Sequence, residues 1–499
     1  MSYDPLYEPR EGLTHRDADW SGINVLVVGL GVSGFAAADA LADRGAHVVA
    51  VSRDETEAIR ERATILEILD VDVRLGPEHM VSPPPGTELV VTSPGVPPHD
   101  PLMLAAATAG IPVWGEVELA WRMRAKEGAA PWITVTGTNG KTTTVNMLAS
   151  ILRHAGLRAT SAGNVGTPLL EAVLHPEPYD VLAVELSSFQ LHWLGPDPER
   201  SVSPLASAVL NVAPDHVDWH GSVDAYARDK GKVYERTRLA CVYNVADPRT
   251  EQLVRDADVV EGCRAVGFTR GVPSIGMLGV VDDVLADRAF VEERRTSAAE
   301  LGTLDDVRGS APTLAPHQVD NALAAAALAR AAGVKPGAVR DGLRGFRPDP
   351  HRIALVATVD GVAFVDDSKA TNPHAAGASM AAFDSVVWVA GGLLKGADVD
   401  DLVRTHAGRL RAAVLLGRDR DQIAAALARH APDVPVVDVD STETGVMETV
   451  VGAAARMARP GDTVLLAPAA ASMDLFRDYA QRGEEFAAAV RRHASGGQR

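Results

Sequence analysis

Short runs of β-branched and other apolar residues alternate with alanine-rich stretches along most of the chain. Ile23 to Leu30 (INVLVVGL) predicts a buried strand, and Phe35 to Gly45 (FAAADALADRG) predicts a helix that ends on glycine. The same alternation recurs around WITVTG in the middle of the chain and around VAFVDDS, SVVWVAGG and AAVLLG in its last third. Strands that alternate with helices form parallel sheets with helical crossovers, so the pattern predicts an α/β protein.

Changes in this pattern divide the chain into three α/β domains. One boundary is expected near Pro112 to Glu116, and the proline-rich segment GFRPDPHR (345–352) forms a second link. Gly267 to Thr313 contains short strand-like pieces among many turn residues, which predicts a hairpin-rich insertion in the middle domain. The predicted domains are a Rossmann-like one at 1–114, a central P-loop-type one at 115–348 and a second Rossmann-like one at 349–499.

Composition narrows the classes of partner. The 499 residues carry a net charge of −18, which argues against nucleic acid or an anionic membrane surface as a ligand. Any anionic substrate must therefore meet a local cluster of cationic side chains and metal. The two cysteines cannot form a disulfide framework, and no apolar run is long enough to insert into a membrane, so we expect a cytoplasmic protein.

A glycine-rich turn, GLGVSG at Gly29 to Gly34, follows the first predicted strand. Such a turn lets backbone N–H groups approach a phosphate at a helix N-terminus. A nicotinamide site would also place an acidic residue at the end of the second strand, but that strand ends at Ser52 and Arg53. A phosphate-bearing ligand of another kind is therefore favoured over NAD, and a purely structural turn is the remaining alternative.

The segment TGTNGKTTT (136–144) predicts a loop that binds a nucleoside triphosphate. It follows the apolar run PWITV, and Gly137, Gly140, Lys141 and Thr142 have the order seen in phosphate-binding loops. The backbone would surround phosphate, the lysine would neutralise its charge and the threonine hydroxyl could ligate Mg²⁺. The loop is two residues shorter than the G-x-x-x-x-G-K-[ST] pattern.

Polar residues end two later strands. Glu185 closes VLAVE, and Asp215 with His216 closes SAVLNVAPDH. Carboxylates at such strand ends commonly hold Mg²⁺ or its water, although an exposed strand-end residue has the same pattern. Lys230 stands in a predicted helix between Asp229 and Lys232, and its sequence context alone indicates a solvated lysine.

The last third contains a dense polar loop, DDSKATNP (366–373), after a predicted strand. This composition fits either a ligand-binding loop, which we favour, or a simple helix N-cap. Lys395 follows Gly391 and Gly392, and it would offer a mobile cation to an anionic ligand.

Eight segments, in this order, resemble the motifs of the Mur ligases over nearly the whole chain: GTNGKTTT, ELSSFQL, NVAPDHVDWH, ARDKGKVYE, HQVDN, PHRI, DDSKATNP and LLAPAAASMD. GTNGKT alone marks a superfamily that includes folylpolyglutamate synthase. ELSSFQL together with DSKATNP resembles the branch of the family that adds D-glutamate. A sister ligase would lack this pair, and a nicotinamide-dependent oxidoreductase would have no role for GTNGKTTT or Lys230. A nucleotide-binding regulator without chemistry stays an alternative, against which the presence of Lys141, Glu185, His216 and Lys369 argues.

The resemblance implies a reaction and its cofactors. ATP would phosphorylate the carboxylate of UDP-N-acetylmuramoyl-L-alanine, and D-glutamate would displace phosphate from the acyl phosphate. Two Mg²⁺ sites are implied, with Lys230 carboxylated by CO₂ to give a carbamate that faces metal. A monomer is expected, with a third domain that swings about the link at 345–352 to close over ATP.

The resemblance also implies roles for individual residues. Catalysis falls to Lys141, Glu185, His216, Lys230 and Lys369, and the metal ligands are Thr142, Glu185, His216 and carboxylated Lys230. ATP would contact Gly137, Thr138, Asn139, Gly140, Lys141, Thr142, Thr143, Asn321, Arg352 and Asp367. The UDP-substrate, held mainly by the first domain, would contact Gly31, Ser33, Ser52, Arg53, Ser93, Gly95, Asn164, Ser187 and Gln190. D-Glutamate would contact Thr371, Lys395 and Ser472.

The sequence departs from the family pattern at three places, none of which concerns the residues assigned to phosphoryl transfer. Ser52 stands where an acidic residue near uracil is common, and Gln318 stands where asparagine is usual near adenine. Leu393 and Leu394 precede Lys395 where small polar residues are common. These positions concern substrate contacts.

Overall fold

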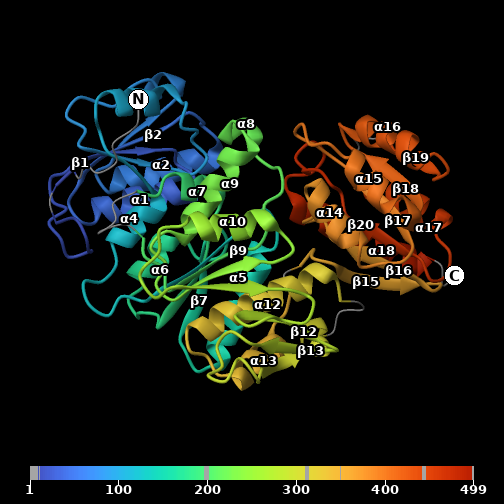
Figure 1. Cartoon of the computed structure of the whole chain (residues 1–499). Coiled ribbons are helices and arrows are strands. Elements are labelled where there is room, and N and C mark those ends of the chain that lie inside the picture. Colours follow the sequence, from blue (N-terminus) through green and yellow to red (C-terminus); the bar gives the residue numbers. More distant parts are fainter. Residues whose placement is uncertain are drawn as a thin grey trace. The chain divides into compact units, whose positions relative to one another are not determined.

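The computed structural model describes residues 9–10, 12–195, 202–309, 314–348, 350–440 and 445–496. The chain forms two compact units, one of residues up to Gly302 with 321–343, the other of 303–320 with the residues from Arg344 onward. Three sheets lie within these units, which confirms the predicted α/β fold (Figure 1). Residues 310–313, at the end of the expected insertion, and residue 349, in the expected link, lie outside the described residues.

The first sheet has the strand order β3-β2-β1-β4-β5 and is parallel throughout. This is the order of a Rossmann-type sheet without its sixth strand, and in such sheets ligands bind at the carboxyl ends of the strands. Its elements are β1 (Asn24–Val28), α1 (Val32–Ala42), β2 (His47–Ser52), α2 (Glu57–Ile68), β3 (Asp72–Leu75), the 3₁₀ turn η1 (Pro77–His79), β4 (Leu89–Thr92), α3 (Pro101–Thr108) and β5 (Val113–Gly115).

The second sheet has nine strands in the order β14-β13-β12-β11-β10-β9-β6-β8-β7. Its parallel part runs from β7 to β12, and the antiparallel pair β12 and β13 supplies the hairpin expected after Gly267. Its strands are β6 (Trp132–Thr136), β7 (Ala159–Gly163), β8 (Val181–Glu185), β9 (Ala206–Val209), β10 (Ala240–Asn244), β11 (Arg264–Phe268), β12 (Met277–Val281), β13 (Val284–Asp287) and β14 (Ala299–Thr303).

The helices associated with this part of the chain are mostly short. One of them, α4, is buried along its whole length and packs against both α1 and α6, so the first two sheets share one apolar core. The expected boundary at residue 114 therefore stays a prediction. The helices are α4 (Glu116–Arg122), α5 (Lys141–His154), α6 (Leu169–Leu174), α7 (Ser188–His192), α8 (Val217–His220), α9 (Val223–Gly231), η2 (Lys232–Tyr234), α10 (Pro248–Asp256), α11 (Leu304–Arg308), α12 (Pro316–Ala331) and α13 (Pro336–Gly345).

The third sheet lies in the second unit, in the order β15-β16-β20-β17-β18-β19, with only β15 antiparallel to its neighbour. Its elements are β15 (Ala354–Val359), β16 (Val362–Asp366), α14 (Pro373–Met380), β17 (Val386–Gly391), α15 (Asp400–His406), η3 (Ala407–Arg409), β18 (Leu410–Leu416), α16 (Arg420–His430), β19 (Val436–Asp438), α17 (Val446–Met457), β20 (Thr463–Leu466) and α18 (Tyr479–Gly496).

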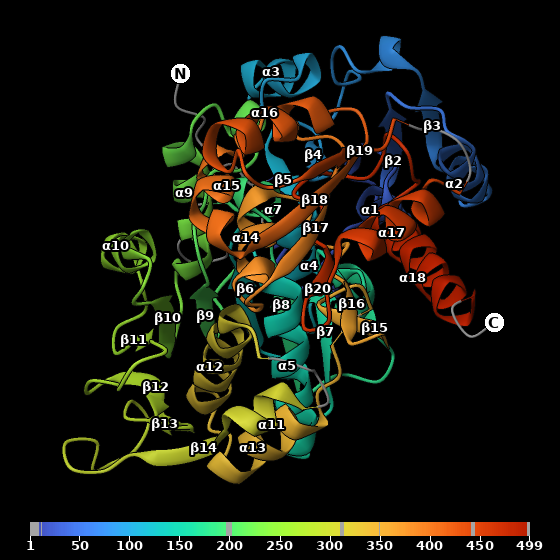
Figure 2. The ribbon, with the colours of Figure 1, turned by 90° about the vertical axis from the view of Figure 1, so that its right-hand side faces the viewer.

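Helices cover both faces of this third sheet (Figure 2). Alternate residues of β17 enter different cores: Trp388 packs with α14, α15 and α16, whereas Val387 and Val389 pack with α17 and α18. This alternation is the period of two that a buried strand requires. The loops at the carboxyl ends of β16, β17 and β20 therefore stand on a well-packed base.

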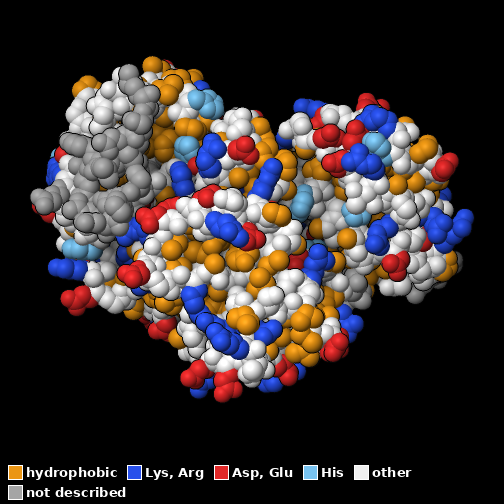
Figure 3. Space-filling view, viewed as in Figure 1, with side chains coloured by type: hydrophobic (Ala, Val, Ile, Leu, Met, Phe, Trp, Pro, Cys, Tyr) orange, Lys and Arg blue, Asp and Glu red, His pale blue; other side chains and the backbone are white. Residues whose placement is uncertain are grey.

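The surface offers few continuous charged patches on the face drawn in Figure 3, where basic and acidic side chains are interspersed. Among the described residues, no helix is long and apolar enough to cross a membrane.

Candidate active site

The phosphate-loop segment joins β6 to α5, as the sequence predicts. Gly140 adopts a left-handed conformation (φ +86°), and a Cβ there would lie 2.4 Å from Oδ1 of Asn321. Only glycine fits this turn, and the close approach places Asn321 against the loop. Lys141 Nζ donates to the carbonyl oxygens of Gly137 (2.8 Å) and Thr138 (3.0 Å), so the lysine folds back over the loop that it would share with phosphate.

Neighbouring strand ends fix the shape of this loop. Asn139 N–H donates to Asn211 Oδ1 (2.9 Å), and Thr138 Oγ1 lies 3.0 Å from the hydroxyl of Tyr226. Thr142 and Thr143 are buried in the first turn of α5. The loop is thus held from β9 and α9 before any ligand arrives, which is the preorganisation that phosphate binding needs.

Glu185 ends β8, as predicted, whereas β9 ends at Val209, so His216 does not close a strand but precedes α8. Glu185 is 2% exposed; its Oε1 accepts from Asn164 Nδ2 (3.0 Å), and its Oε2 has no hydrogen-bond partner among the described residues. An unpaired buried carboxylate oxygen fits a cation ligand. His216 caps the start of α8 at φ +50°, and although its side chain is partly exposed, desolvation of the ring, together with the nearby Lys230 and Lys141, lowers its pKa and favours the neutral imidazole that binds metal.

The interpretation of Lys230 as a solvated lysine is wrong. The side chain is 1% exposed, its Nζ donates to Gly137 O (2.9 Å) and lies 4.4 Å from the ring centre of Tyr226. Burial, followed by the charge of Lys141, sets the pKa of Lys230 well below its ordinary value. The helix turns it inward because the α9 face that carries Tyr226 and Lys230 packs on the phosphate loop, which helix periodicity at i and i+4 allows.

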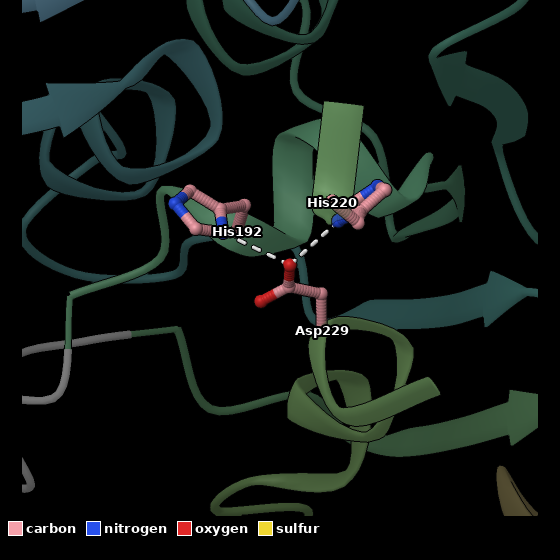
Figure 4. A group of neighbouring side chains, drawn as sticks. All are labelled: His192, His220 and Asp229. Carbon is pink, nitrogen blue, oxygen red and sulfur yellow. Dashed lines mark hydrogen bonds and ion pairs between the residues drawn. The ribbon is translucent and has the colours of Figure 1, made fainter. Parts of the chain in front are cut away.

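A buried polar chain lies beside Lys230. His192 and His220 both point their Nδ1 atoms at Oδ2 of Asp229, at 2.9 and 2.8 Å (Figure 4). On its other side, His220 Nε2 lies 3.0 Å from Ser188 Oγ, and Lys232 Nζ is 3.2 Å from Asp229 Oδ1. We call Ser188, His192, His220, Asp229 and Lys232 the imidazole cluster.

Three members of the imidazole cluster lie close in sequence to the residues predicted to bind metal. Ser188 follows Glu185 by three residues, His220 follows His216 by four, and Asp229 precedes Lys230. Although burial opposes it, the hydrogen bonds from His192 and His220 lower the pKa of Asp229, so the carboxylate is ionised. The i,i+4 spacing of His216 and His220 in DHVDWH was the available sequence signal for this cluster.

The same three groups, His192, His220 and Asp229, have the composition of a metal site. The arrangement is better explained by hydrogen bonds, because the Lys232 ammonium already neutralises the carboxylate and each imidazole Nδ1 has a 2.8–2.9 Å acceptor. A divalent cation would have to displace these contacts next to a fixed positive charge. We therefore assign the cluster a positioning role.

The residues predicted to hold the UDP-substrate gather at the carboxyl ends of β1, β2 and β4. Ser93 Oγ donates to Gly29 O (2.9 Å), and a Cβ on Gly34 would lie 1.7 Å from that same oxygen. Arg53 pairs with buried Asp100 (2.6 Å), and Ser52 donates to Asp54 O (3.1 Å). Gly31, Ser33 and Gly95 lie in the same turns, which suits a phosphate-bearing ligand.

The remaining substrate residues come from the second sheet. Ser187 caps α7 in a reciprocal pair with Gln190, at 3.2 and 2.9 Å. The sequence analysis missed Glu116, which is 4% exposed and hydrogen-bonds Ser33 and Gln190; burial raises its pKa. This carboxyl group connects the glycine-rich turn to the ELSSFQL segment, and no spacing pattern marked it.

The second unit holds the other predicted residues. Asp367 is buried and accepts from Ile353 N–H (3.3 Å) and from Ser379 Oγ, with the charge of Arg352 nearby. Lys369 Nζ lies 5.3 Å from the ring centre of Tyr479, and Thr371 is half-buried in the same loop. Ser472 is buried after β20, while Lys395 is exposed after β17.

Two expectations about this unit need revision. Gly391 and Gly392 are packed rather than flexible, because a Cβ on either would lie about 2 Å from the carbonyl oxygen of Leu416 or Ala471. Gln318 uses its side-chain carbonyl oxygen to accept from Ala315 N–H (2.8 Å) at the start of α12. The DDSKATNP loop contains the expected helix N-cap, since Asn372 caps α14 by accepting from Ala375 N–H, and its ligand-binding role stays a prediction.

Family models match three stretches of the chain: the Mur ligase MurD-like N-terminal domain (residues 23–115), the Mur ligase middle domain (135–329) and the Mur ligase glutamate ligase domain (351–470). The chain belongs to the Mur ligase family. The confirmed family also accounts for the short phosphate loop and for the three sheets, and it identifies the chain as a ligase with ATP and Mg²⁺ as its cofactors.

Relatives in the Mur ligase family are similar over almost their full length. The UDP-N-acetylmuramoylalanine–D-glutamate ligases of Streptomyces avermitilis and Streptomyces coelicolor are each 60% identical, covering 95% of this chain and 99% of theirs. That of Thermobifida fusca is 56% identical over 94% of this chain. The crystal structure of UDP-N-acetylmuramate-alanine ligase MurC from Thermotoga maritima, 19% identical with a TM-score of 0.54 over 95% of this chain, shares the fold.

Proposed function

We propose that this Mur ligase joins D-glutamate to UDP-N-acetylmuramoyl-L-alanine at the expense of ATP, in peptidoglycan precursor synthesis. The observation that carries the proposal is the 60% identity, over 95% of the chain, to relatives named for this reaction. The geometry supports it, because the phosphate loop, two lysines and an unpaired carboxylate oxygen meet at one edge of the second sheet.

The reaction solves a leaving-group problem. A carboxylate cannot release oxide, so the terminal carboxylate of the muramoyl substrate takes the γ-phosphoryl group of ATP, and ADP leaves. The amine of D-glutamate then attacks the acyl carbon, phosphate departs with the bonding electrons, and the amine proton passes to solvent or phosphate. Several anions must be crowded together in an acidic protein, so cationic clamps carry most of the catalysis.

The predicted ATP-binding and metal-binding residues of the first unit each have a defined part in this proposal. Lys141 releases the loop carbonyls and contacts the β- and γ-phosphates, beside Gly137 to Thr143 and Asn321. Thr142 would hold one Mg²⁺, and Glu185, His216 and Lys230 would hold the second. Bound Mg²⁺ would neutralise the charge that develops on the transferred phosphoryl group.

We further propose that Lys230 is carboxylated by CO₂. Its neutral amine forms a C–N bond to CO₂ and loses one proton, giving a carbamate anion. The low pKa that burial imposes supplies the neutral amine, and the neighbouring Lys141 disfavours a cation but would stabilise a carbamate. The carbamate oxygens would be ligands for Mg²⁺, as carboxylates are.

The residues of the second unit would serve ATP and the amino acid. Arg352 and Asp367 are assigned to ATP, and Lys369, Thr371, Lys395 and Ser472 to D-glutamate or to the transferring phosphate.

The muramoyl substrate would be held by residues of the first unit, namely Ser33, Gln190 and Asn164 with Gly31, Ser52, Arg53, Ser93, Gly95 and Ser187. Closure about the link at 345–352, the monomeric state and the cytoplasmic location stay predictions.

The deciding experiment is phosphate release from ATP in the presence of UDP-N-acetylmuramoyl-L-alanine, with D-glutamate compared against L-glutamate and other amino acids. We expect release that requires the nucleotide substrate and D-glutamate together. Release with a different amino acid would retain the ATP-dependent mechanism and move the chain to a sister ligase. Absence of release with every pairing would contradict the proposal.

A further inference from the structure

A buried arginine connects the loops of the second unit. Arg482 lies in the first turn of α18 and is 1% exposed. Its Nε donates to Ser368 Oγ (3.0 Å), one terminal nitrogen donates to Ser368 O (2.8 Å), and the other donates to Ala470 O (3.1 Å) and more weakly to Gly391 O (3.4 Å). The sequence analysis did not single out this residue.

Every acceptor of Arg482 lies in, or immediately before, a loop that carries a residue assigned to the amino acid. Ser368 precedes Lys369, Ala470 stands two residues before Ser472, and Gly391 stands four before Lys395. These loops follow β16, β20 and β17, which are adjacent in the third sheet. The guanidinium group of Arg482 therefore fixes the spacing of the three loops near the points where they leave their strands.

The loops also contact one another, so a shift in one would reach the others. Leu393 and Ala471 exchange both backbone hydrogen bonds, at 2.8 and 2.9 Å. Gly483, next to Arg482, has no room for a side chain, because a Cβ would lie 2.2 Å from His351 Nδ1 and 2.8 Å from Asp366 Oδ2. The start of α18 is thus pressed against the end of β16.

We propose that Arg482 is a positioning residue for the amino-acid substrate, fixing the relative placement of Lys369, Lys395 and Ser472. The inference rests on the proposed function for the identity of that substrate. Arg482 does not touch the substrate in this account; it acts through backbone carbonyls and one hydroxyl group, and so determines the shape of the site rather than its charge.

The chemistry of the guanidinium group suits this role. Its donors are arranged in a rigid fork that can serve several acceptors at once, whereas an ammonium group is a single point. Burial lowers the pKa of Arg482 to about 10, with Asp474 and Asp366 opposing the shift, so the group stays charged at neutral pH. A lysine here would keep the charge and lose the geometry.

The ATP-assigned residue in the same loop has independent support. Asp367 is held by Ile353 N–H and by Ser379 Oγ, neither of which belongs to the arginine network. Loss of Arg482 should therefore disturb the amino-acid contacts more than the ATP contact. Because the amino-acid contacts and the ATP contact have separate supports, the proposal can be tested by comparing the KM values of the enzyme for its three substrates.

The test is steady-state kinetics of Arg482→Lys and Ser368→Ala in the full chain. We expect the KM for D-glutamate to rise about tenfold in Arg482→Lys and less in Ser368→Ala, with the KM values for ATP and the muramoyl substrate within about twofold of wild type. The matched control is Arg411→Lys, since Arg411 pairs with Asp462 (3.1 Å) at the opposite edge of the same sheet.

A KM for D-glutamate unchanged in both folded variants would overturn the positioning role, as would equal rises in all three KM values. If Arg482→Lys does not fold, Ser368→Ala alone decides between these outcomes. Failure of the proposed function would be visible separately, because wild type itself would then show no release dependent on D-glutamate.

Discussion

The two units hold their proposed substrate residues in different ways. In the first unit the imidazole cluster joins side chains to side chains, with a carboxylate between two imidazoles and an ammonium group. In the second unit Arg482 joins a side chain mainly to backbone carbonyls. The first arrangement sets the charge beside the residues proposed to bind metal, whereas the second fixes only the shape of the loops.

The difference follows from what each site must bind. The phosphate loop places Lys141 near buried Lys230, and burial together with the charge of Lys141 disfavours a second positive charge there until anions arrive. Such a site carries an electrostatic cost that binding relieves, which is common where function and stability compete. The amino-acid site, by contrast, can be built from neutral loops that present a few charged side chains at their tips.

The largest effect is expected when the buried lysine is replaced. Lys230→Met keeps most of the volume but removes the amine, so turnover should fall by about 10³-fold or more, and bicarbonate should not restore it. Because the variant removes a buried amine that must give up its proton when the chain folds, it should also unfold at a higher temperature. Steady-state phosphate release and thermal unfolding measure the two effects, with exposed Lys126→Met as the control.

Bicarbonate separates the carbamate from a merely buried lysine. If Lys230 carries CO₂, the unfolding temperature of wild type should rise with bicarbonate because the carbamate pairs with Lys141, and that of Lys230→Met should not. Near-normal turnover by Lys230→Met would remove the residue from the mechanism. An unfolding temperature of wild type that is insensitive to bicarbonate would contradict the carbamate alone.

The imidazole cluster should give the next largest effect. His220→Ala breaks the contacts with Ser188 and Asp229, so we expect kcat to fall about 10–100-fold and the Mg²⁺ concentration for half-maximal rate to rise. The KM for D-glutamate should stay within about twofold, in contrast to Arg482→Lys. His175→Ala, at the surface, is the control. A normal Mg²⁺ requirement in folded His220→Ala would refute the positioning role of the cluster.

The α/β fold could be predicted from sequence patterns because local periodicity and turn chemistry agree with the final structure. The second predicted strand, expected to end at Ser52 and Arg53, is β2, and the second glycine of TGTNGKTTT is required by the left-handed turn at Gly140. Strand-end logic placed Glu185 correctly, whereas β9 ends at Val209 and His216 follows it by seven residues, at the start of α8. Local rules were sufficient wherever a residue acts through its own element.

The same rules failed where burial comes from a distant element. Lys230 follows Asp229 in a polar helix, and only packing against the phosphate loop turns it inward. Glu116 and Arg482 have ordinary helical neighbours, yet each joins segments far apart in sequence. Family resemblance recovered Lys230 but neither of the other two, so tertiary contacts were needed to find the residues that hold the sites together.

The smallest expected effect concerns the charge of Asp367 and its contribution to the stability of the second unit. Burial raises the pKa of Asp367 from 3.8 to about 6, with Ser379 and Arg352 opposing the shift. The folded protein then binds more protons than the unfolded chain between about pH 4 and 6, so stability from this residue declines as the pH rises through that window. Above it, the ionised carboxylate costs about 3 kcal/mol.

Asp367→Asn should therefore gain stability relative to wild type as the pH rises from 4 to 6.5, by about 5 °C in unfolding temperature. The amide keeps an acceptor for Ile353 N–H and can donate to Ser379 Oγ, whose own proton is then free for Ala375 O (3.1 Å). Thermal unfolding across this pH range, with fully exposed Asp384→Asn as the control, measures the difference. A pH-independent difference would mean that Asp367 is ionised throughout, and that charge as well as shape is built into the second site.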